Sequence, residues 1–221
     1  MKSHAQVVIV GGGIMGVSLL YHLTKEGWSD VVLIEKGELT SGSTWHAAGQ
    51  CPHFVGSYNA AKIHNYSNKL YQNLEKETGQ STGWHGCGSL RLALKEDDVD
   101  WFHYVKGILD NVGSPAEFVP KEKILDLHPF LKIEDVLCAL HTPEDGHTDP
   151  TGATNAMAIA ARKAGAEIYR HNRVLEINKL QSGEWEIVTE KGKILSEHVV
   201  NAAGSFGIEV GAMVGLSNIP S

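Results

Sequence analysis

The 221-residue sequence lacks the features that mark several large protein classes. It contains no run of about 18 apolar residues, which excludes a helix that crosses a membrane. Its beginning has no charged-then-apolar segment of the kind that directs secretion. These absences predict a cytoplasmic protein, or a protein of the mitochondrial matrix if the chain is a mature eukaryotic form.

Cysteine and excess positive charge are also scarce. Cys51, Cys87 and Cys138 are widely spaced and form no CxxC pair, so we expect reduced thiols and neither a disulfide framework nor a metal site. The formal net charge of −7 and the lack of a basic stripe argue against a nucleic-acid partner. The content of hydrophobic residues, 42%, is enough to bury the core of an α/β protein.

Glycine is common, and three glycines near the start have the GxGxxG spacing. A strand is expected at residues 6–10 and a helix at 17–26. Between them, Gly11 permits a tight turn, Gly13 lets the backbone approach a pyrophosphate, and Gly16 lets the helix pack closely on the strand. The start of the helix would offer free N–H groups to phosphate. This segment predicts a Rossmann-like unit that binds a dinucleotide.

The residues after this motif narrow the choice of dinucleotide. Glu35 ends a second expected strand, at 31–34, about 20 residues beyond the glycines, where a carboxylate accepts hydrogen bonds from ribose hydroxyls and repels a ribose phosphate. FAD or NAD is therefore expected, and not NADP. Residues 41–50 are mostly small or hydroxylic, with Trp45 and His46 as the bulky groups. Such a loop suits a backbone that wraps a large ligand, which favours FAD.

Apolar periodicity predicts the remaining elements. Helices are expected at 58–78, 95–111, 121–127 and 151–164, the last with Asp149 as its N-cap. Short strands are expected at 89–94, 137–141, 167–169, 173–180, 185–189, 193–195 and 198–201. The turn at Ala202, Ala203 and Gly204 would let backbone N–H groups approach the cofactor's phosphates.

The run from Ala5 to Ala93 resembles the dimethylglycine and sarcosine dehydrogenase branch of the glycine oxidase and D-amino-acid oxidase family, and most of all the dimethylglycine dehydrogenases. Residues 41–49 carry the specific likeness, which continues through 86–93, 145–150 and 200–204. The resemblance implies a glutathione-reductase-like FAD/NAD(P)-binding fold with a central parallel sheet and a β-meander. It also implies an incomplete FAD-binding domain, residues 1–83 and 144–221, and an inserted part of an α+β substrate domain, residues 84–143.

In that branch the histidine that matches His46 carries FAD through a covalent bond. A neutral imidazole is a nucleophile, so correct placement alone could drive attachment; a loop histidine bonded to backbone is the alternative account. Position by position, the resemblance gives the remaining FAD-binding residues as Gly11, Gly13, Ile14, Met15, Gly16, Glu35, Lys36, Gly42, Ser43, Thr44, Trp45, Ala47, Ala48, Gly49, Gln50, Val174, Ala203 and Gly204. For Val174, a core valine is an equally good account.

The activity that the resemblance implies is oxidation of a CH–NH group by a flavoprotein. An N-methyl amino acid such as dimethylglycine or sarcosine would lose a methyl group by hydride transfer to the flavin, and the one-carbon unit would leave as formaldehyde or pass to folate. An electron-transfer flavoprotein or oxygen would accept the electrons. The sequence identifies no catalytic base.

Two other groups of residues have plainer explanations. Asp145, His147 and Asp149 could form an acid–base cluster, but a loop-organising role is favoured. His85 beside Cys87 could activate a thiol, but a surface turn is favoured, because no third group is near in sequence to orient the histidine.

The resemblance also implies a truncated chain, because Pro220 and Ser221 fall before the last segment of the FAD fold. Two rival functions follow from the sequence. One is a catalytically incomplete FAD-binding fragment or subunit that needs a second chain. The other is an NAD-dependent dehydrogenase, which the loop at 41–49 disfavours.

Overall fold

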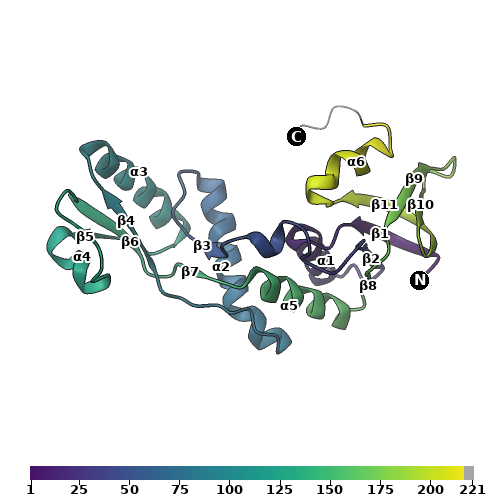
Figure 1. Ribbon diagram of the computed structural model, residues 1–221, viewed down its shortest axis with the longest axis horizontal. Helices are drawn as coiled ribbons and strands as arrows, with labels where there is room; N and C mark the ends of the chain where they lie inside the picture. Colours follow the sequence, from purple (N-terminus) through teal and green to yellow (C-terminus); the bar gives the residue numbers. More distant parts are fainter. Residues whose placement is uncertain (217–221) are drawn as a thin grey trace. The chain divides into compact units, whose positions relative to one another are not determined.

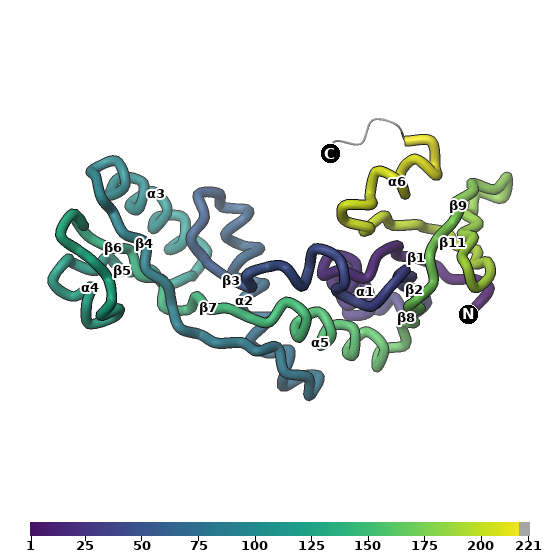
Figure 2. The backbone as a smooth tube through the Cα atoms, viewed as in Figure 1, coloured from purple at the N-terminus to yellow at the C-terminus, as the bar shows by residue number. Residues whose placement is uncertain are grey.

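The computed structural model describes residues 1–216, and contacts divide them into two compact units. Unit 1 comprises residues 1–48, 74–82 and 149–216, and unit 2 comprises residues 49–73 and 83–148. Figure 2 shows how unit 1 combines the purple start of the chain with its green and yellow end. Within residues 1–216, no helix has the length and apolar character needed to cross a membrane.

Unit 1 is built on a six-stranded sheet with the order β8-β2-β1-β11-β10-β9 (Figure 1). Strands β8, β2, β1 and β11 are parallel, whereas β11, β10 and β9 form an antiparallel meander. The strands are β1 (His4–Val10), β2 (Val31–Ile34), β8 (Glu167–Tyr169), β9 (Val174–Lys179), β10 (Trp185–Thr189) and β11 (Gly192–Asn201). The expected combination of a parallel sheet and a meander is present.

Helices cover both faces of this sheet, which explains why β1 and β2 are continuous apolar runs. On one face, Val8 and Ile34 join a buried cluster with Val210 of α6 (Gly207–Ala212). On the other face, α1 (Ile14–Lys25) packs against α5 (Pro150–Lys163). Figure 1 shows α6 and α5 on opposite sides of the sheet. The core of unit 1 is therefore a three-layer arrangement.

The meander differs from the sequence-based prediction in one respect. The strands expected at 193–195 and 198–201 are a single strand, β11. Its first half pairs with β10 and its second half with β1, and Ser196 is fully buried between them. The Ser196 hydroxyl lies 2.7 Å from the His198 carbonyl oxygen, to which it donates a hydrogen bond. This local hydrogen bond allows the Ser196 hydroxyl to be buried within the strand. The sequence-based prediction had instead ended one strand before this serine and begun another after it.

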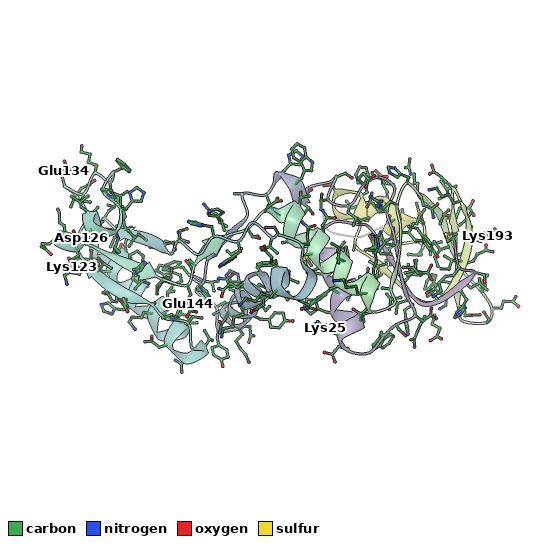
Figure 3. The ribbon with its side chains drawn as sticks, turned by 90° about the horizontal axis from the view of Figure 1, so that it is seen from below. Lys25, Lys123, Asp126, Glu134, Glu144 and Lys193 are labelled. Carbon is green, nitrogen blue, oxygen red and sulfur yellow. The ribbon has the colours of Figure 1, made fainter. Side chains whose placement is uncertain are left out.

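Unit 2 contains a three-stranded antiparallel sheet with the order β4-β6-β5, covered by two helices. Its elements are β4 (Ser89–Ala93), α3 (Glu96–Val112), β5 (Glu117–Pro120), α4 (Lys121–Leu127) and β6 (Cys138–Thr142). Leu109 of α3 and Leu140 of β6 share one buried cluster, and Ile124 of α4 belongs to another. Figure 3 shows Lys123 and Asp126 of α4 directed outward, away from this core.

Several short elements escaped prediction. The two-residue strands β3 (Gln50–Cys51) and β7 (Gly146–His147) pair with each other, and β5 also had no recognised pattern. The short helices η1 (Thr44–His46), η2 (Gly204–Phe206) and α6 were missed as well. The long helix α2 (Tyr58–Thr78) has the predicted bounds, and α1 begins at Ile14, three residues before its predicted start.

The functional division of the chain stays a prediction. Unit 2 includes residues 49–73, which the sequence-based division placed in the FAD-binding part, but compactness alone does not say which unit binds a cofactor. The expected truncation concerns Pro220 and Ser221, which lie outside the described residues.

The N-cap of α5 has the predicted chemistry and can be tested directly. The Asp149 carboxylate accepts hydrogen bonds from the N–H groups of Thr151 (3.1 Å) and Gly152 (2.9 Å). We expect Asp149→Ala to lower the free energy of unfolding by about 1 kcal/mol, because two helix N–H groups lose their acceptor. Urea titration followed by circular dichroism measures this change. Asp126→Ala, which removes an exposed carboxylate on α4, is the control; an equal loss in both variants would contradict the capping role.

Candidate functional site

The candidate site lies where the parallel strands β1, β2 and β11 end, at the carboxyl edge of the sheet in unit 1. Open α/β sheets place their ligands at this edge. The glycine loop follows β1 there, and Gly11 has φ +117°. A Cβ on Gly11 would lie 2.7 Å from the carbonyl carbon of Ala202, and a Cβ on Gly16 would overlap the carbonyl oxygen of Gly11. The positive φ of Gly11 agrees with its predicted role in a tight turn, and the close contact at Gly16 agrees with its predicted role in packing the helix on the strand.

The turn after β11 lies against the glycine loop. The Ala202 N–H donates to the Val10 carbonyl (2.9 Å), which brings Ala203 and Gly204 beside Gly11. The side chain of Asn201 fixes this turn, because its Oδ1 accepts from the Ala203 N–H (3.2 Å) and its Nδ2 donates to the Gly207 carbonyl (2.7 Å). Two segments about 190 residues apart in sequence thus form one backbone cradle.

Glu35 is buried under the glycine loop, with 9% of its surface exposed. One carboxylate oxygen accepts from the Gly12 N–H and the other from the Gly37 N–H, each at 2.7 Å. A carboxylate offers about four lone-pair positions, so two acceptor positions stay free for ribose hydroxyls. The carboxylate that was predicted to bind ribose holds the glycine loop in shape through these two bonds.

The loop at residues 41–48 contacts the beginning of α1 through the side chain of Thr44. The hydroxyl oxygen of Thr44 accepts a hydrogen bond from the Ile14 N–H (2.9 Å) and lies 3.2 Å from the position of a Cβ on Gly13. Thr44 is buried, whereas Gly42, Ser43, Ala47 and Ala48 are exposed. The threonine was predicted to touch the cofactor, and the structure shows that it ties this loop to the amino-terminal end of α1.

Trp45 and His46 stand next to this anchored threonine on η1. Both side chains are exposed, Trp45 by 58%, and their ring centroids lie 3.8 Å apart with planes tilted by 35°. Within residues 1–216 the ring nitrogens of His46 have no hydrogen-bond partner, so the alternative of a loop histidine bonded to backbone has no support there. The imidazole is accessible for chemistry.

The other residues that were predicted to bind FAD differ in their exposure and in the unit to which they belong. Met15 is 74% exposed at the start of α1, and the ammonium of Lys36 lies over the ring of Phe206. Val174 is buried in the sheet cluster, in agreement with the core-valine alternative. The predicted residues in unit 2 are Gly49 and Gln50, which are held by Thr148 and by the β3–β7 pairing.

The residues of unit 1 fit a dinucleotide with a pyrophosphate. A side chain at Gly11 or Gly16 would fill the cradle, and the first N–H groups of α1 have no acceptors within the helix. Glu35 retains free acceptor positions, as ribose hydroxyls require. Gly11, Gly13, Gly16, Ala203 and Gly204 would hold the pyrophosphate side of FAD, and Glu35 its ribose.

Unit 2 contains a buried polar cluster that the sequence indicated only in part. Asp145 and His53 are each 2% exposed, and one Asp145 oxygen lies 2.7 Å from both the backbone nitrogen and Nδ1 of His53. The other oxygen accepts from the hydroxyls of Ser89 and Thr142, the latter at 2.5 Å. Asn68 of α2 donates to the Cys51 carbonyl (2.9 Å) beside this pair. We call these residues, His53, Asn68, Ser89, Thr142 and Asp145, the Asp145 cluster.

Two opposing effects set the pKa of the Asp145 carboxyl. Burial raises it, but hydrogen bonds from His53, Ser89 and Thr142 outweigh burial, so the pKa lies below its ordinary value. Burial of the Cys51 thiol, together with the nearby charge of Asp145, raises the pKa of this thiol to about 11. The cysteine therefore stays protonated and unreactive at neutral pH.

The residues of the suspected acid–base trio therefore have separate roles. Asp145 organises the cluster, Asp149 caps α5, and His147 is exposed on β7. His85 pairs with His147 as an isolated bridge, and Cys87 is exposed in the turn that follows. The predictions of a loop-organising aspartate and a surface turn agree with these positions. His53 and Asn68 were missed, because nothing local in the sequence relates them to Asp145.

Comparisons with known proteins agree with this architecture. Residues 6–220 match the family model described as FAD dependent oxidoreductase. The chain is 44% identical over 217 residues to mitochondrial dimethylglycine dehydrogenase of Rattus norvegicus, covering 98% of this chain and 25% of that protein. It is 40% identical over 211 residues to the mitochondrial pyruvate dehydrogenase phosphatase regulatory subunit of Mus musculus, covering 96% of this chain and 24% of that protein. The chain thus spans about a quarter of the length of these relatives.

The crystal structure of L-proline dehydrogenase from P. horikoshii is similar to the whole chain, with a TM-score of 0.91 and 29% identity, and the match covers 58% of that enzyme. The predicted fold class is confirmed by this similarity.

The tight approach of Gly11 to Ala202 predicts a specific sensitivity. We expect Gly11→Ala to lower the free energy of unfolding by about 3 kcal/mol or more, because it adds a clash to the strain of a positive φ. Gly27→Ala is the matched control: Gly27 also has a positive φ (+89°), but a Cβ there meets no atom within 4 Å. Urea unfolding of both variants separates the two effects, and equal losses would contradict the importance of the close approach.

The Asp145 cluster predicts a pH-dependent stability. Because the folded-state pKa of Asp145 is lowered, its contribution is present above the unfolded-state pKa of about 4 and is lost as pH falls through the folded-state value. We expect Asp145→Asn to cost about 3 kcal/mol at pH 7 and to flatten the acid side of the stability curve. Urea unfolding between pH 7 and pH 3 measures both effects. Glu144→Gln, at the exposed neighbour of Asp145 that Figure 3 labels, is the control and should change neither.

Proposed function

We propose, from the premise that this chain belongs to the family of FAD-dependent oxidoreductases, that unit 1 binds FAD as part of an enzyme that oxidises an N-methyl amino acid. One observation carries the proposal: the glycine loop, Glu35, the Thr44 loop and the turn at Ala203 converge at the carboxyl edge of one parallel sheet. Such an edge suits a dinucleotide, and FAD is the dinucleotide that the family description names.

We further propose that His46 holds the flavin covalently. Its imidazole is exposed, and Thr44, two residues earlier, is bonded to the phosphate-binding end of α1. A neutral imidazole nitrogen has a lone pair available for bonding, so the protein's contribution is placement. Attachment at this point would keep the cofactor in its cradle during turnover.

Dimethylglycine is the first candidate substrate and sarcosine the second. When bound, FAD would supply the chemistry by accepting a hydride from an N-methyl carbon. The substrate nitrogen must be neutral to release that hydride, so the site must favour the deprotonated amine. No side chain of residues 1–216 is assigned as the base. An electron-transfer flavoprotein or oxygen would then accept the electrons.

A second candidate function is that of a non-catalytic subunit. It is favoured by the similarity to a protein named as a regulatory subunit. A subunit of this kind could retain the FAD cradle without oxidising an amine. The rat and mouse relatives are named as mitochondrial proteins, so a mitochondrial matrix location joins the expected cytoplasmic one as part of the proposal.

FAD binding and its covalent attachment through His46 are tested by a simple measurement. We expect the purified chain, supplied with FAD, to remain yellow after acid precipitation, and His46→Ala to release all of its flavin into the supernatant. His4→Ala, at an exposed histidine on β1, is the control and should retain the colour in the pellet. Flavin found only in the wild-type supernatant would contradict covalent attachment, and a colourless protein would contradict FAD binding itself.

A further inference from the structure

A contact between two side chains crosses the candidate site. The ammonium nitrogen of Lys36 lies 3.0 Å from the ring centroid of Phe206. Lys36 comes just after β2, whereas Phe206 ends η2, the short helix that follows β11. Neither side chain is needed for the core, since Lys36 is exposed and Phe206 is 43% exposed.

The strand order determines what this contact spans. Strand β1 lies between β2 and β11 in the sheet, and all three are parallel, so their carboxyl ends lie side by side. The ends of β2 and β11 are about 10 Å apart, which is two strand spacings. The glycine loop leaves the end of β1 in the space between them. The Lys36–Phe206 pair therefore bridges the two sides of the dinucleotide cradle.

The backbone on each side of the bridge is held firmly. Beside Lys36, the Gly37 N–H donates to the buried Glu35 carboxylate. Beside Phe206, the Asn201 side chain bonds to both Ala203 and Gly207. The backbone beside Lys36 and beside Phe206 is thus held in place by hydrogen bonds. The Lys36 and Phe206 side chains themselves are exposed and can change rotamer.

The chemistry of the bridge suits a reversible closure. A lysine ammonium over an aromatic face is attracted by the ring quadrupole, with a modest energy when the pair is exposed. The contact can therefore open for a ligand to enter and close again afterwards.

We infer that Phe206, by holding Lys36 across the end of β1, forms a strap that retains the dinucleotide in its cradle. This inference rests on the proposed function, because it takes FAD as the ligand. It assigns a role to Phe206, which no sequence motif indicated, and it makes Lys36 a retaining residue through its contact with that ring.

The test measures release of FAD that is not covalently attached. In the His46→Ala background, FAD-loaded protein is diluted rapidly into a large volume of FAD-free buffer, and the time course of the flavin fluorescence change gives the dissociation rate. Phe206→Leu keeps an apolar side chain but removes the ring, and Lys36→Met keeps the aliphatic stem but removes the charge. We expect each to raise the dissociation rate about threefold, and the double variant to raise it no further, because both break one contact.

Lys179→Met is the matched control. Its ammonium lies 4.4 Å from the ring centroid of Trp185, but β9 and β10 are neighbours, so this pair spans no cradle. We expect its release rate to equal that of the His46→Ala parent. Far-UV circular dichroism of each variant verifies that the fold is retained.

The outcomes separate this inference from the proposed function. If no form of the chain binds FAD, the proposed function fails and the strap fails with it. If FAD binds but release is unchanged in Phe206→Leu, the strap alone is wrong. An increase in Lys36→Met without one in Phe206→Leu would mean that lysine acts directly on the cofactor. Additive effects in the double variant would mean that the two side chains act independently, which also overturns the strap.

Discussion

The close approach of the Gly11 backbone to the Ala202 carbonyl is the constraint on which the site depends. Only a residue without a Cβ permits it, and it brings the turn after β11 against the loop after β1. The glycine loop, the buried Glu35 carboxylate and the Thr44 hydroxyl are then fixed relative to one another by backbone hydrogen bonds. The cradle is consequently built mainly from main-chain groups, which tolerate change in most surrounding side chains.

The two units use buried polar groups for similar purposes. In unit 1, Glu35 accepts two backbone N–H groups and shapes a loop. In unit 2, the Asp145 carboxylate contacts three segments of the chain: His53 in the segment before α2, Ser89 at the start of β4, and Thr142 at the end of β6. In both cases a carboxylate is buried with its hydrogen bonds satisfied, so its desolvation is compensated and the local conformation is specified.

Sequence patterns predicted the elements whose signals are local. The glycine spacing, the acid at position 35, the helix at 58–78 and the Asp149 cap each depend on neighbours within one or two turns, and all are present. The patterns missed what depends on distant partners: the pairing of β3 with β7, the continuity of β11 through Ser196, and the union of His53 with Asp145. Their stabilising contacts join residues tens or hundreds of positions apart, which local periodicity does not encode.

The pairing of β1 with β11 has a consequence for how the protein is made. Val8, in one of the two central strands of the sheet, meets its partner Val199 only after 191 further residues have been synthesised. Every strand of unit 2, in contrast, is complete by residue 148. Unit 2 can therefore fold during synthesis, while β1 and β2 wait with an unpaired apolar edge that chaperones would have to shield.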